Sequence, residues 1–349
     1  MENTDTAIKG MGCAVLIPCY NEGMTIGKVV DDFRRVLPYA AIYVYDNNSN
    51  DDTASIAQKH GAIVRREVRQ GKGNVVRQMI RDIDADYYLM VDGDDTYPAE
   101  AAPSLLAPLI DGSADHVVGD RLSNGTYAAE NKRAFHGFGN DLVRWLIKVL
   151  YHFEFTDVMT GYRSFTRAFA DTLPVLSPGF EIETELSIHA VDKRWRIAQV
   201  PIDYRDRPEG SVSKLNTVSD GFKVLKMIAS LFKDYKPLAF FSILSLISLI
   251  ICLCLGIPVI GDYMATGLVE RFPTAILSMA FGLIAIMLFT CGLILDTIVK
   301  ANRRQWELTV YEIEHRTREE KRSMGCESHT AQGRAAYSIA EEADGQARA

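Results

Sequence analysis

The residues best suited to chemistry are two aspartates, Asp92 and Asp94, which stand one residue apart directly after an apolar run. That run, residues 87–91, is typical of a buried strand, so both carboxylates lie at a strand end. Carboxylates with this spacing can bind one divalent cation, and such a cation can bridge the oxygens of a departing diphosphate. An acidic loop after a strand also occurs in proteins without any metal, so the pair alone leaves both interpretations open.

Other polar clusters follow earlier apolar runs in the same way. Asn21 and Glu22 follow one run, and Asp46 and Asn48 follow the next. The two runs cover residues 13–17 and 42–45. Helical patterns between the runs cover residues 25–37, 51–60 and 72–83. Alternating strands and helices predict an α/β domain with a mostly parallel sheet, in which ligands bind at the carboxyl ends of the strands.

Two later segments, residues 238–261 and 274–295, carry no charge. A spanning helix needs about 20 apolar residues, so we expect two transmembrane helices, at 238–261 and 274–297, that form a hairpin. The alternative is a pair of buried core helices, but these rarely keep such a length without a polar face. The hairpin also offers surface for a homo-oligomer.

Lysine and arginine predict the orientation of this hairpin. Lys233 and Lys236 precede it and Lys300 and Arg303 follow it, whereas the connecting loop carries only Arg271. By the positive-inside rule we expect an integral protein of the inner (plasma) membrane, with the catalytic domain and both termini in the cytosol.

The remaining segments complete the expected organisation. After an N-terminal extension at residues 1–11, the catalytic domain covers residues 12–217. Residues 218–236 have an apolar face and a lysine face, which predicts an amphipathic helix at the membrane interface; an amphipathic helix packed on the domain is the alternative. The polar composition of residues 300–349 predicts a cytosolic, largely disordered tail.

Composition excludes some classes of protein. Of the 349 residues 48% are hydrophobic, which is too apolar for a disordered protein. The formal net charge of -7 argues against a nucleic-acid partner, because such proteins usually carry a basic excess. The six cysteines form no CxxC pair, which favours a reduced, cytosolic catalytic part.

Four motifs appear in a fixed order in the first part of the domain, at residues 18–22, 46–53, 70–73 and 91–95. Their order and spacing resemble those of the family 2 glycosyltransferases, which have the GT-A fold. The resemblance implies that Asp92 and Asp94 lie at a Mg²⁺ or Mn²⁺ ion and at the diphosphate of a nucleotide sugar. It implies the following nucleotide-binding residues: Pro18, Tyr20, Asn21, Glu22, Asp46, Asn48, Lys72 and Asp92. From the residues alone, Asp46 could instead be a cap or turn residue, as could Asp51, and Lys72 a solvated residue at a helix start.

Motifs farther along the chain, at residues 119–121, 131–133, 156–163, 179–185 and 207–215, resemble the polyprenyl phosphate branch, which includes the dolichol phosphate mannose and glucose synthases. The branch implies Asp94, Asp157 and Arg121 as catalytic residues. It implies these residues at the lipid phosphate: Lys132, Arg133, Arg207, Ser213 and Lys214. A phosphate monoester carries a charge near -2, so basic side chains must screen it from the donor, although each one alone could be a surface charge.

One departure from the branch concerns the metal. Many relatives carry Gln two residues after the second aspartate, where this chain has Thr96, so a contribution of Thr96 or Asp95 to metal binding stays open. Asp157 is expected to orient the acceptor or to assist proton transfer, with a structural cap as the alternative. Three glutamates, Glu181, Glu183 and Glu185, begin a helix, and one of them is expected to contact the sugar.

We therefore expect a metal-dependent, inverting hexosyltransferase that moves a sugar from a nucleotide donor to a polyprenyl phosphate. A UDP-sugar is favoured as donor, and GDP-mannose also fits. One alternative is a processive polysaccharide synthase, but Val191 stands where the Q-x-x-R-W signature of those enzymes needs Gln. The other alternative is a non-catalytic membrane module that binds sugar nucleotides.

Overall fold

The computed structural model describes residues 12–124, 136–179, 181–207, 230 and 232–346. Its centre is a seven-stranded sheet with the order β3-β2-β1-β4-β6-β5-β7. The strands are β1 (Cys13–Cys19), β2 (Ala41–Asp46), β3 (Ile63–Arg66), β4 (Tyr87–Met90), β5 (His116–Asp120), β6 (Arg163–Thr166) and β7 (Ile197–Pro201). Strand β6 runs antiparallel to β4 and β5, and the other neighbours pair in parallel. The predicted mostly parallel α/β domain is confirmed.

Strand β1 explains why helices cover both faces of the sheet. Val15 and Ile17 are buried in the core on one face, whereas Ala14 and Leu16 are buried in the core on the other. Because successive side chains of a strand point to opposite faces, an unbroken apolar run must be covered on both sides. The run in β1 therefore requires a three-layer arrangement.

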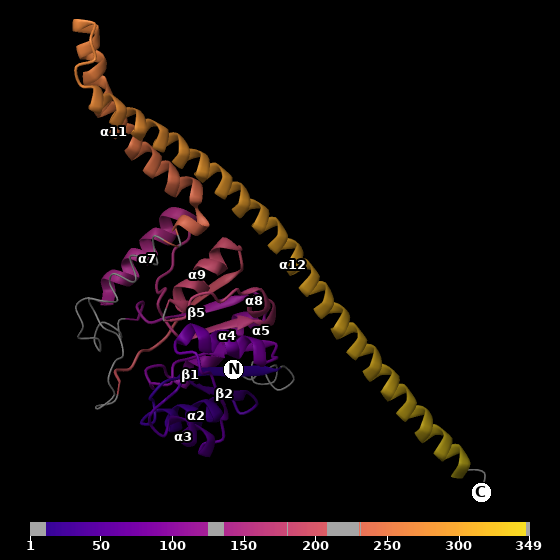
Figure 1. Ribbon diagram of the computed structural model, residues 1–349. Coiled ribbons are helices and arrows are strands. Elements are labelled where there is room, and N and C mark those ends of the chain that lie inside the picture. Colours follow the sequence, from indigo (N-terminus) through magenta and orange to yellow (C-terminus); the bar gives the residue numbers. More distant parts are fainter. Residues whose placement is uncertain (1–11, 125–135, 180, 208–229, 231, 347–349) are drawn as a thin grey trace. The chain divides into compact units, whose positions relative to one another are not determined.

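The helices supply the two outer layers (Figure 1). One face of the sheet carries α2 (Ile26–Val36), α3 (Thr53–Lys59), the 3₁₀ turn η1 (Ala99–Ala101) and α5 (Ala102–Ile110). The other face carries α4 (Lys72–Asp82), α8 (Arg167–Thr172) and α9 (Ile182–Asp192). Helix α7 (His136–Tyr151) packs through Val143 and Ile147 against Ile188 of α9.

The direction of β6 brings a further loop to the ligand-binding edge of the sheet. Arg163, the first residue of β6, pairs with Met90, the last residue of β4. The residues before Arg163 therefore meet the residues after Met90, at the edge where β1, β2, β3, β4, β5 and β7 end. Seven loops thus converge on one edge.

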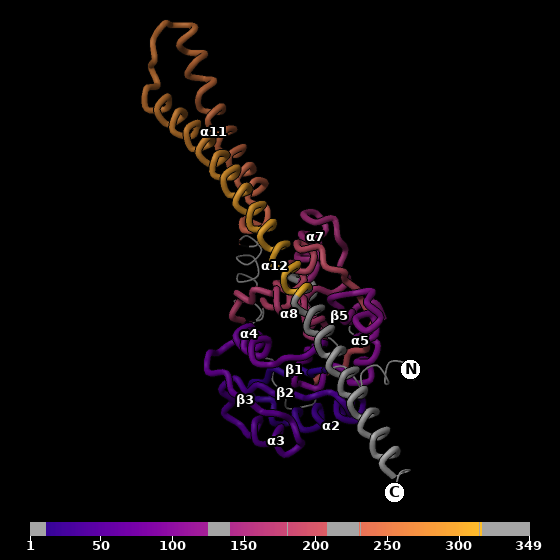
Figure 2. Tube along the Cα trace, turned by 90° about the vertical axis from the view of Figure 1, so that its right-hand side faces the viewer, coloured from indigo at the N-terminus to yellow at the C-terminus, as the bar shows by residue number. Residues whose placement is uncertain are grey.

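The C-terminal part consists of two long helices, α11 (Pro237–Thr266) and α12 (Phe272–Gln346). Helix α11 and the part of α12 up to Ile313 are long and apolar enough to cross a membrane. In the most apolar 18-residue stretch of each helix, only 11% and 17% of the residues are buried, whereas a core helix of a soluble protein is mostly buried. Helix α11 and the part of α12 before Lys300 lie side by side (Figure 2), and Ser245 and Ser248 on α11 donate hydrogen bonds to carbonyls of Ala285 and Phe281 on α12. These helices indicate membrane association.

Helix α12 continues to Gln346. The segment after residue 300 is rich in alanine, glutamate and arginine and contains no proline, and these residues have high helix propensity.

Candidate active site

The acidic turn after β4 carries Asp92 and Asp94, and hydrogen bonds fix its shape. Thr25, at the start of α2, donates from its hydroxyl to the carbonyl oxygen of Gly93 at 2.7 Å. The Thr96 hydroxyl donates to Asp94 Oδ1 at 2.7 Å. Asp95 has a left-handed backbone with φ of 59° and accepts from Lys28 Nζ at 2.6 Å. The turn thus sends Asp95 to α2 and keeps it apart from the other two aspartates.

Two basic side chains from distant parts of the chain contact the aspartate pair. Lys72 Nζ donates to Asp92 Oδ1, and Arg207 Nη2 donates to Asp94 Oδ2. Lys72 also donates to Glu183 Oε1 at 2.5 Å. Burial by itself would lower the pKa of Lys72, but the attraction of Asp92 and Glu183 outweighs burial and raises the pKa above its ordinary value. Lys72 therefore stays a cation in this buried position.

The two glycines beside Lys72 allow helix α4 to start close to another loop. A Cβ atom at Gly71 would lie 2.1 Å from the carbonyl oxygen of Pro178, and one at Gly73 would lie 1.9 Å from that of Ser177. Gly71 also has a φ of 126°, which side chains rarely adopt. The Gly-Lys-Gly motif thus lets α4 pack against the loop that leads into α9 and Glu183.

The first two predicted nucleotide motifs are joined to each other at the ends of β1 and β2. The backbone N–H of Asn21 donates to Ser49 Oγ at 2.9 Å, and the backbone N–H of Asn50 donates to Asn21 Oδ1 at 2.7 Å. The Glu22 amide donates to Thr53 Oγ1 at 2.9 Å. Pro18 lies in β1 opposite Tyr45, and Tyr20 follows that strand. These contacts bring the two motifs into one wall of the site.

Asp46 and Asp51 hold the turn between β2 and α3. Asp46 is buried and accepts from the backbone N–H of Ser49 at 3.2 Å. This contact is that of a turn residue, which was the alternative to a nucleotide-binding role for Asp46. Asp51 accepts from the amides of Thr53 at 3.1 Å and Gly23 at 3.0 Å. Both carboxylates thus stabilise loops that carry predicted nucleotide-binding residues.

Asn47 is a residue that the sequence analysis missed. Its side-chain amide donates to the carbonyl oxygens of Glu67 and Arg69, and its Oδ1 accepts from the Gly71 amide at 2.6 Å. Its neighbour Asn48, with a φ of 63°, donates to the carbonyl oxygen of Val68 at 2.8 Å. Asn47 and Asn48 therefore fix the loop that delivers Lys72. The signal was present in the sequence, since Asn47 lies inside the motif that starts at Asp46.

Arg121 and Asp157 form a bidentate ion pair at the same edge. Arg121 Nε and Nη2 donate to Asp157 Oδ2 and Oδ1 at 2.6 and 3.0 Å. The guanidinium also donates to the Tyr97 hydroxyl at 3.3 Å and lies 5.7 Å from the centre of the Tyr204 ring. The Asp157 side chain is 0% exposed. This geometry favours a structural role for Asp157, in which it orients Arg121, over direct contact with an acceptor.

A buried arginine, Arg163, shapes the turn that carries Asp157. Its guanidinium donates to the carbonyl oxygen of Thr160 at 2.9 Å, to that of Val158, and to Ser187 Oγ at 2.9 Å. Burial lowers the pKa of Arg163 to about 10. The side chain is 0% exposed, so these bonds fix the 158–160 turn to helix α9 from inside the domain.

The donor atoms at the acidic turn suit a hard divalent cation. Mg²⁺ is usually bound by one or two carboxylates, with substrate phosphates and waters completing the shell. In the described part of the chain no group of three or more acidic, histidine or cysteine side chains could hold a metal. Asp92 and Asp94 already accommodate the positive charges of Lys72 and Arg207. The residues fit a cation held by two protein carboxylates and a bound diphosphate.

The three glutamates at the start of α9 have different surroundings. Glu183 contacts Lys72, and burial raises its pKa although Lys72 opposes the shift. Glu185 accepts from the amides of Leu176 and Ser177 at 3.0 and 2.9 Å and so supports a loop. Of the three, Glu183 is the one that the described contacts connect to Asp92.

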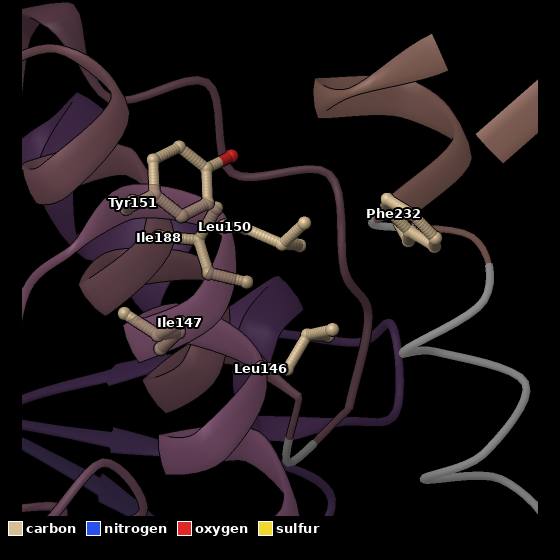
Figure 3. A pocket seen from close by; sticks show the side chains of 6 residues that line it. All are labelled: Leu146, Ile147, Leu150, Tyr151, Ile188 and Phe232. Atoms are coloured by element: carbon tan, nitrogen blue, oxygen red, sulfur yellow. The ribbon is translucent and has the colours of Figure 1, made fainter. Parts of the chain in front are cut away.

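Four of the predicted lipid-phosphate residues, Lys132, Arg133, Ser213 and Lys214, lie outside the described residues, as does most of the expected amphipathic helix. An apolar pocket lies between α7, Ile188 and Phe232 (Figure 3) and is lined by Leu146, Ile147, Leu150, Tyr151, Ile188 and Phe232. Its volume of about 10 Å³ is that of a single water, so it is too small for a lipid chain.

The parallel sheet edge, the acidic turn and the Gly-Lys-Gly loop together are those of a glycosyltransferase with the GT-A type of fold. Residues 14–171 match the family model described as glycosyl transferase family 2. Glycosyltransferase AglJ of Haloferax volcanii is 32% identical over 292 residues, which cover 83% of this chain and 95% of the relative. The chain belongs to glycosyl transferase family 2.

A second relative and a solved structure add detail. A dolichyl-phosphate hexose transferase of Haloferax volcanii is 33% identical over 215 residues, which cover 62% of this chain and 91% of that protein. Glucosyl-3-phosphoglycerate synthase of Mycobacterium tuberculosis, solved with Mn²⁺, UDP-glucose and phosphoglyceric acid, aligns with a TM-score of 0.53 and 25% identity. That alignment covers 66% of this chain and 82% of the synthase.

Proposed function

We propose that this protein transfers a sugar from a nucleotide sugar to the phosphate of a polyprenyl phosphate lipid, at the cytosolic face of the membrane. The observation that carries the proposal is one sheet edge where Asp92, Asp94, Lys72, Arg121 and Arg207 converge, in a chain with two long apolar helices. The dolichyl-phosphate hexose transferase among the relatives supports a lipid phosphate as acceptor.

Asp92 and Asp94 would hold Mg²⁺ or Mn²⁺ in this proposal. A bound divalent cation stabilises the negative charge that develops on the departing diphosphate. The solved complex of the mycobacterial synthase with Mn²⁺ and UDP-glucose supports a UDP-sugar as donor, with GDP-mannose as the other donor that fits. The wall formed by residues 18–22 and 46–53 would contact the nucleoside.

The basic residues would let two polyanions approach each other. Lys72 would bind the donor diphosphate, while Arg121 and Arg207 would bind the acceptor phosphate, together with Lys132, Arg133, Ser213 and Lys214. The guanidinium of Arg121 is suited to this task because Asp157 fixes its plane with two hydrogen bonds. Asp157 thereby acts as a positioning residue.

In the chemical step, an oxygen of the lipid phosphate attacks the anomeric carbon, and the bond from that carbon to the diphosphate breaks. The electron pair of the broken bond leaves with the nucleoside diphosphate, and the configuration at the anomeric carbon inverts. The attacking oxygen is already ionised, so this transfer needs no general base. Positioning and leaving-group stabilisation would supply the rate acceleration.

The proposed orientation follows from the charges around the hairpin. Residues 12–217 would form the cytosolic catalytic domain, and residues 218–236 would lie at the membrane interface. Both termini would be cytosolic, on the side where nucleotide sugars are available.

The decisive experiment incubates the purified full-length protein with labelled UDP-glucose, UDP-N-acetylglucosamine or GDP-mannose, a polyprenyl phosphate and Mg²⁺ or Mn²⁺. A lipid-linked monosaccharide is the expected product. A long polymer would indicate a processive synthase, and the absence of any product with every donor would contradict the proposal. Asp94→Asn should abolish transfer, whereas the matched variant Asp95→Asn should retain it, because Asp95 faces Lys28.

A further inference from the structure

Arg207 lies where the proposed cation has to bind. Asp94 Oδ1 is held by its own turn, since it accepts from the hydroxyl and the amide of Thr96 at 2.7 and 3.2 Å. Asp94 Oδ2 accepts from Arg207 Nη2. The two carboxylate oxygens therefore both have partners, and Oδ2 is the oxygen that a cation can take over without breaking the turn.

Arg207 is also the more accessible of the two basic residues on the aspartate pair. The Lys72 side chain is 8% exposed and lies between Asp92 and Glu183, whereas the Arg207 side chain is 26% exposed. Arg207 comes from the segment after β7, which is joined to the acidic turn by a 3.0 Å bond from the Arg205 amide to the carbonyl oxygen of Thr96. That bond keeps the Arg207 backbone near the turn even if its side chain leaves Asp94.

We infer that Arg207 and the divalent cation compete for Asp94 Oδ2, so that binding of the cation releases the guanidinium to bind the lipid phosphate. The inference rests on the proposed function. An unpaired buried carboxylate is costly, so Arg207 stabilises Asp94 while no cation is bound. A dication attracts the carboxylate more strongly than a monocation does. The released guanidinium has the planar shape that suits a phosphate.

The competition gives the two substrates an order. Before the donor and its cation bind, Arg207 is engaged with Asp94 and the acceptor phosphate has one strong ligand fewer. After they bind, the guanidinium is available a short distance from the site of the leaving diphosphate. Capture of the lipid phosphate is thereby coupled to a loaded donor site.

The test measures Mn²⁺ binding to the full-length protein in detergent, with the same saturating concentration of UDP in every sample, by electron paramagnetic resonance of Mn²⁺. Arg207→Gln should bind Mn²⁺ about ten- to a hundredfold more tightly than the wild type, the range expected for one charge-assisted hydrogen bond. Arg207→Lys keeps a competing cation and should stay within a few fold of the wild type. The control Arg205→Gln should also match the wild type, since Arg205 is 48% exposed and pairs with Glu100.

A second arm adds farnesyl phosphate, a short polyprenyl phosphate. Because coupling between two ligands is reciprocal, farnesyl phosphate should tighten Mn²⁺ binding in the wild type and have a much smaller effect in Arg207→Gln. If tighter binding in Arg207→Gln came with no response of the wild type to farnesyl phosphate, the transfer of Arg207 to the phosphate would be refuted.

The outcomes separate this inference from the proposed function. Equal Mn²⁺ affinity in the wild type and Arg207→Gln, with binding lost in Asp94→Asn, would overturn the competition and leave the metal site standing. Mn²⁺ binding that does not depend on Asp94, or no binding in either protein, would overturn the metal site and the inference together.

Discussion

Replacing Gly161 by alanine should crowd the Asp92 carboxylate while leaving the backbone unstrained. A Cβ atom at position 161 would lie 2.4 Å from Asp92 Oδ2 and 2.8 Å from its Cγ, and real Cβ atoms essentially never come within 3.0 Å of another atom. Gly161 is not among the residues with a left-handed backbone, so alanine can adopt its conformation. The Asp92 side chain must therefore move, and it loses its place beside Lys72.

The size of the effect follows from the displacement of the Asp92 carboxylate. Because Asp92 is a flexible side chain that is 27% exposed, it relieves the crowding by moving, and the lost contacts of its charged group cost about 1–3 kcal/mol. If that cost falls on the Asp92 position that binds the donor, the affinity for UDP with Mn²⁺ drops by about 5- to 150-fold, at 1.4 kcal/mol per factor of ten. Isothermal titration calorimetry on the purified variant measures this, and its thermal unfolding shows whether the domain is intact.

A double-mutant cycle checks that the effect acts through Asp92. In an Asp92→Ala background the carboxylate is absent, so Gly161→Ala should cause no further loss of the residual nucleotide affinity. The reasoning is refuted if Gly161→Ala binds UDP as the wild type does, or if it weakens binding equally in both backgrounds.

Two further predictions concern other contacts in the domain. Thr96→Val removes the hydroxyl that orients Asp94. It should lower kcat/KM about fivefold to tenfold, as expected for a lost hydrogen bond of about 1–1.5 kcal/mol. Thr96→Ser keeps the hydroxyl and should restore the rate, and equal rates for both variants would contradict this role. Burial lowers the pKa of His189 to about 3 from an unfolded value of 6.5. Its contribution to stability is therefore complete above pH 6.5 and is lost at about 1.4 kcal/mol per pH unit as the pH falls toward 3. His189→Gln should flatten that loss in denaturant unfolding at pH 7 and pH 5, and an unchanged slope would argue against it.

The sequence predicted the elements whose local pattern is strong. The apolar runs of β1, β2 and β4 and the helices between them lie within two residues of their expected bounds. Strand β3 was missed because its residues, Ile63–Arg66, include two arginines and lie at the edge of the sheet, where no apolar run is required.

The sequence could name the residues of the site but not their partners. Lys72 and Glu183 are 111 residues apart, and Asp94 and Arg207 are 113 residues apart. No local pattern indicates which cation meets which carboxylate, because that depends on how the strands are ordered. For Asp157 the motif indicated a place near the acceptor, but the burial of its carboxylate against Arg121 became visible only in three dimensions.

The antiparallel strand β6 explains why Asp157 and Gly161 belong to this site at all. In a purely parallel sheet the residues before a strand lie at the edge opposite the ligand, so a turn ending at Arg163 would be remote from Asp92. Because β6 runs the other way, that turn meets the end of β4, and Gly161 comes against the Asp92 carboxylate. The same reversal brings Asp157, which precedes β6, to Arg121, which follows β5 and already lies at the edge of the acidic turn. One reversed strand therefore brings the proposed acceptor side of the site into contact with the proposed donor side.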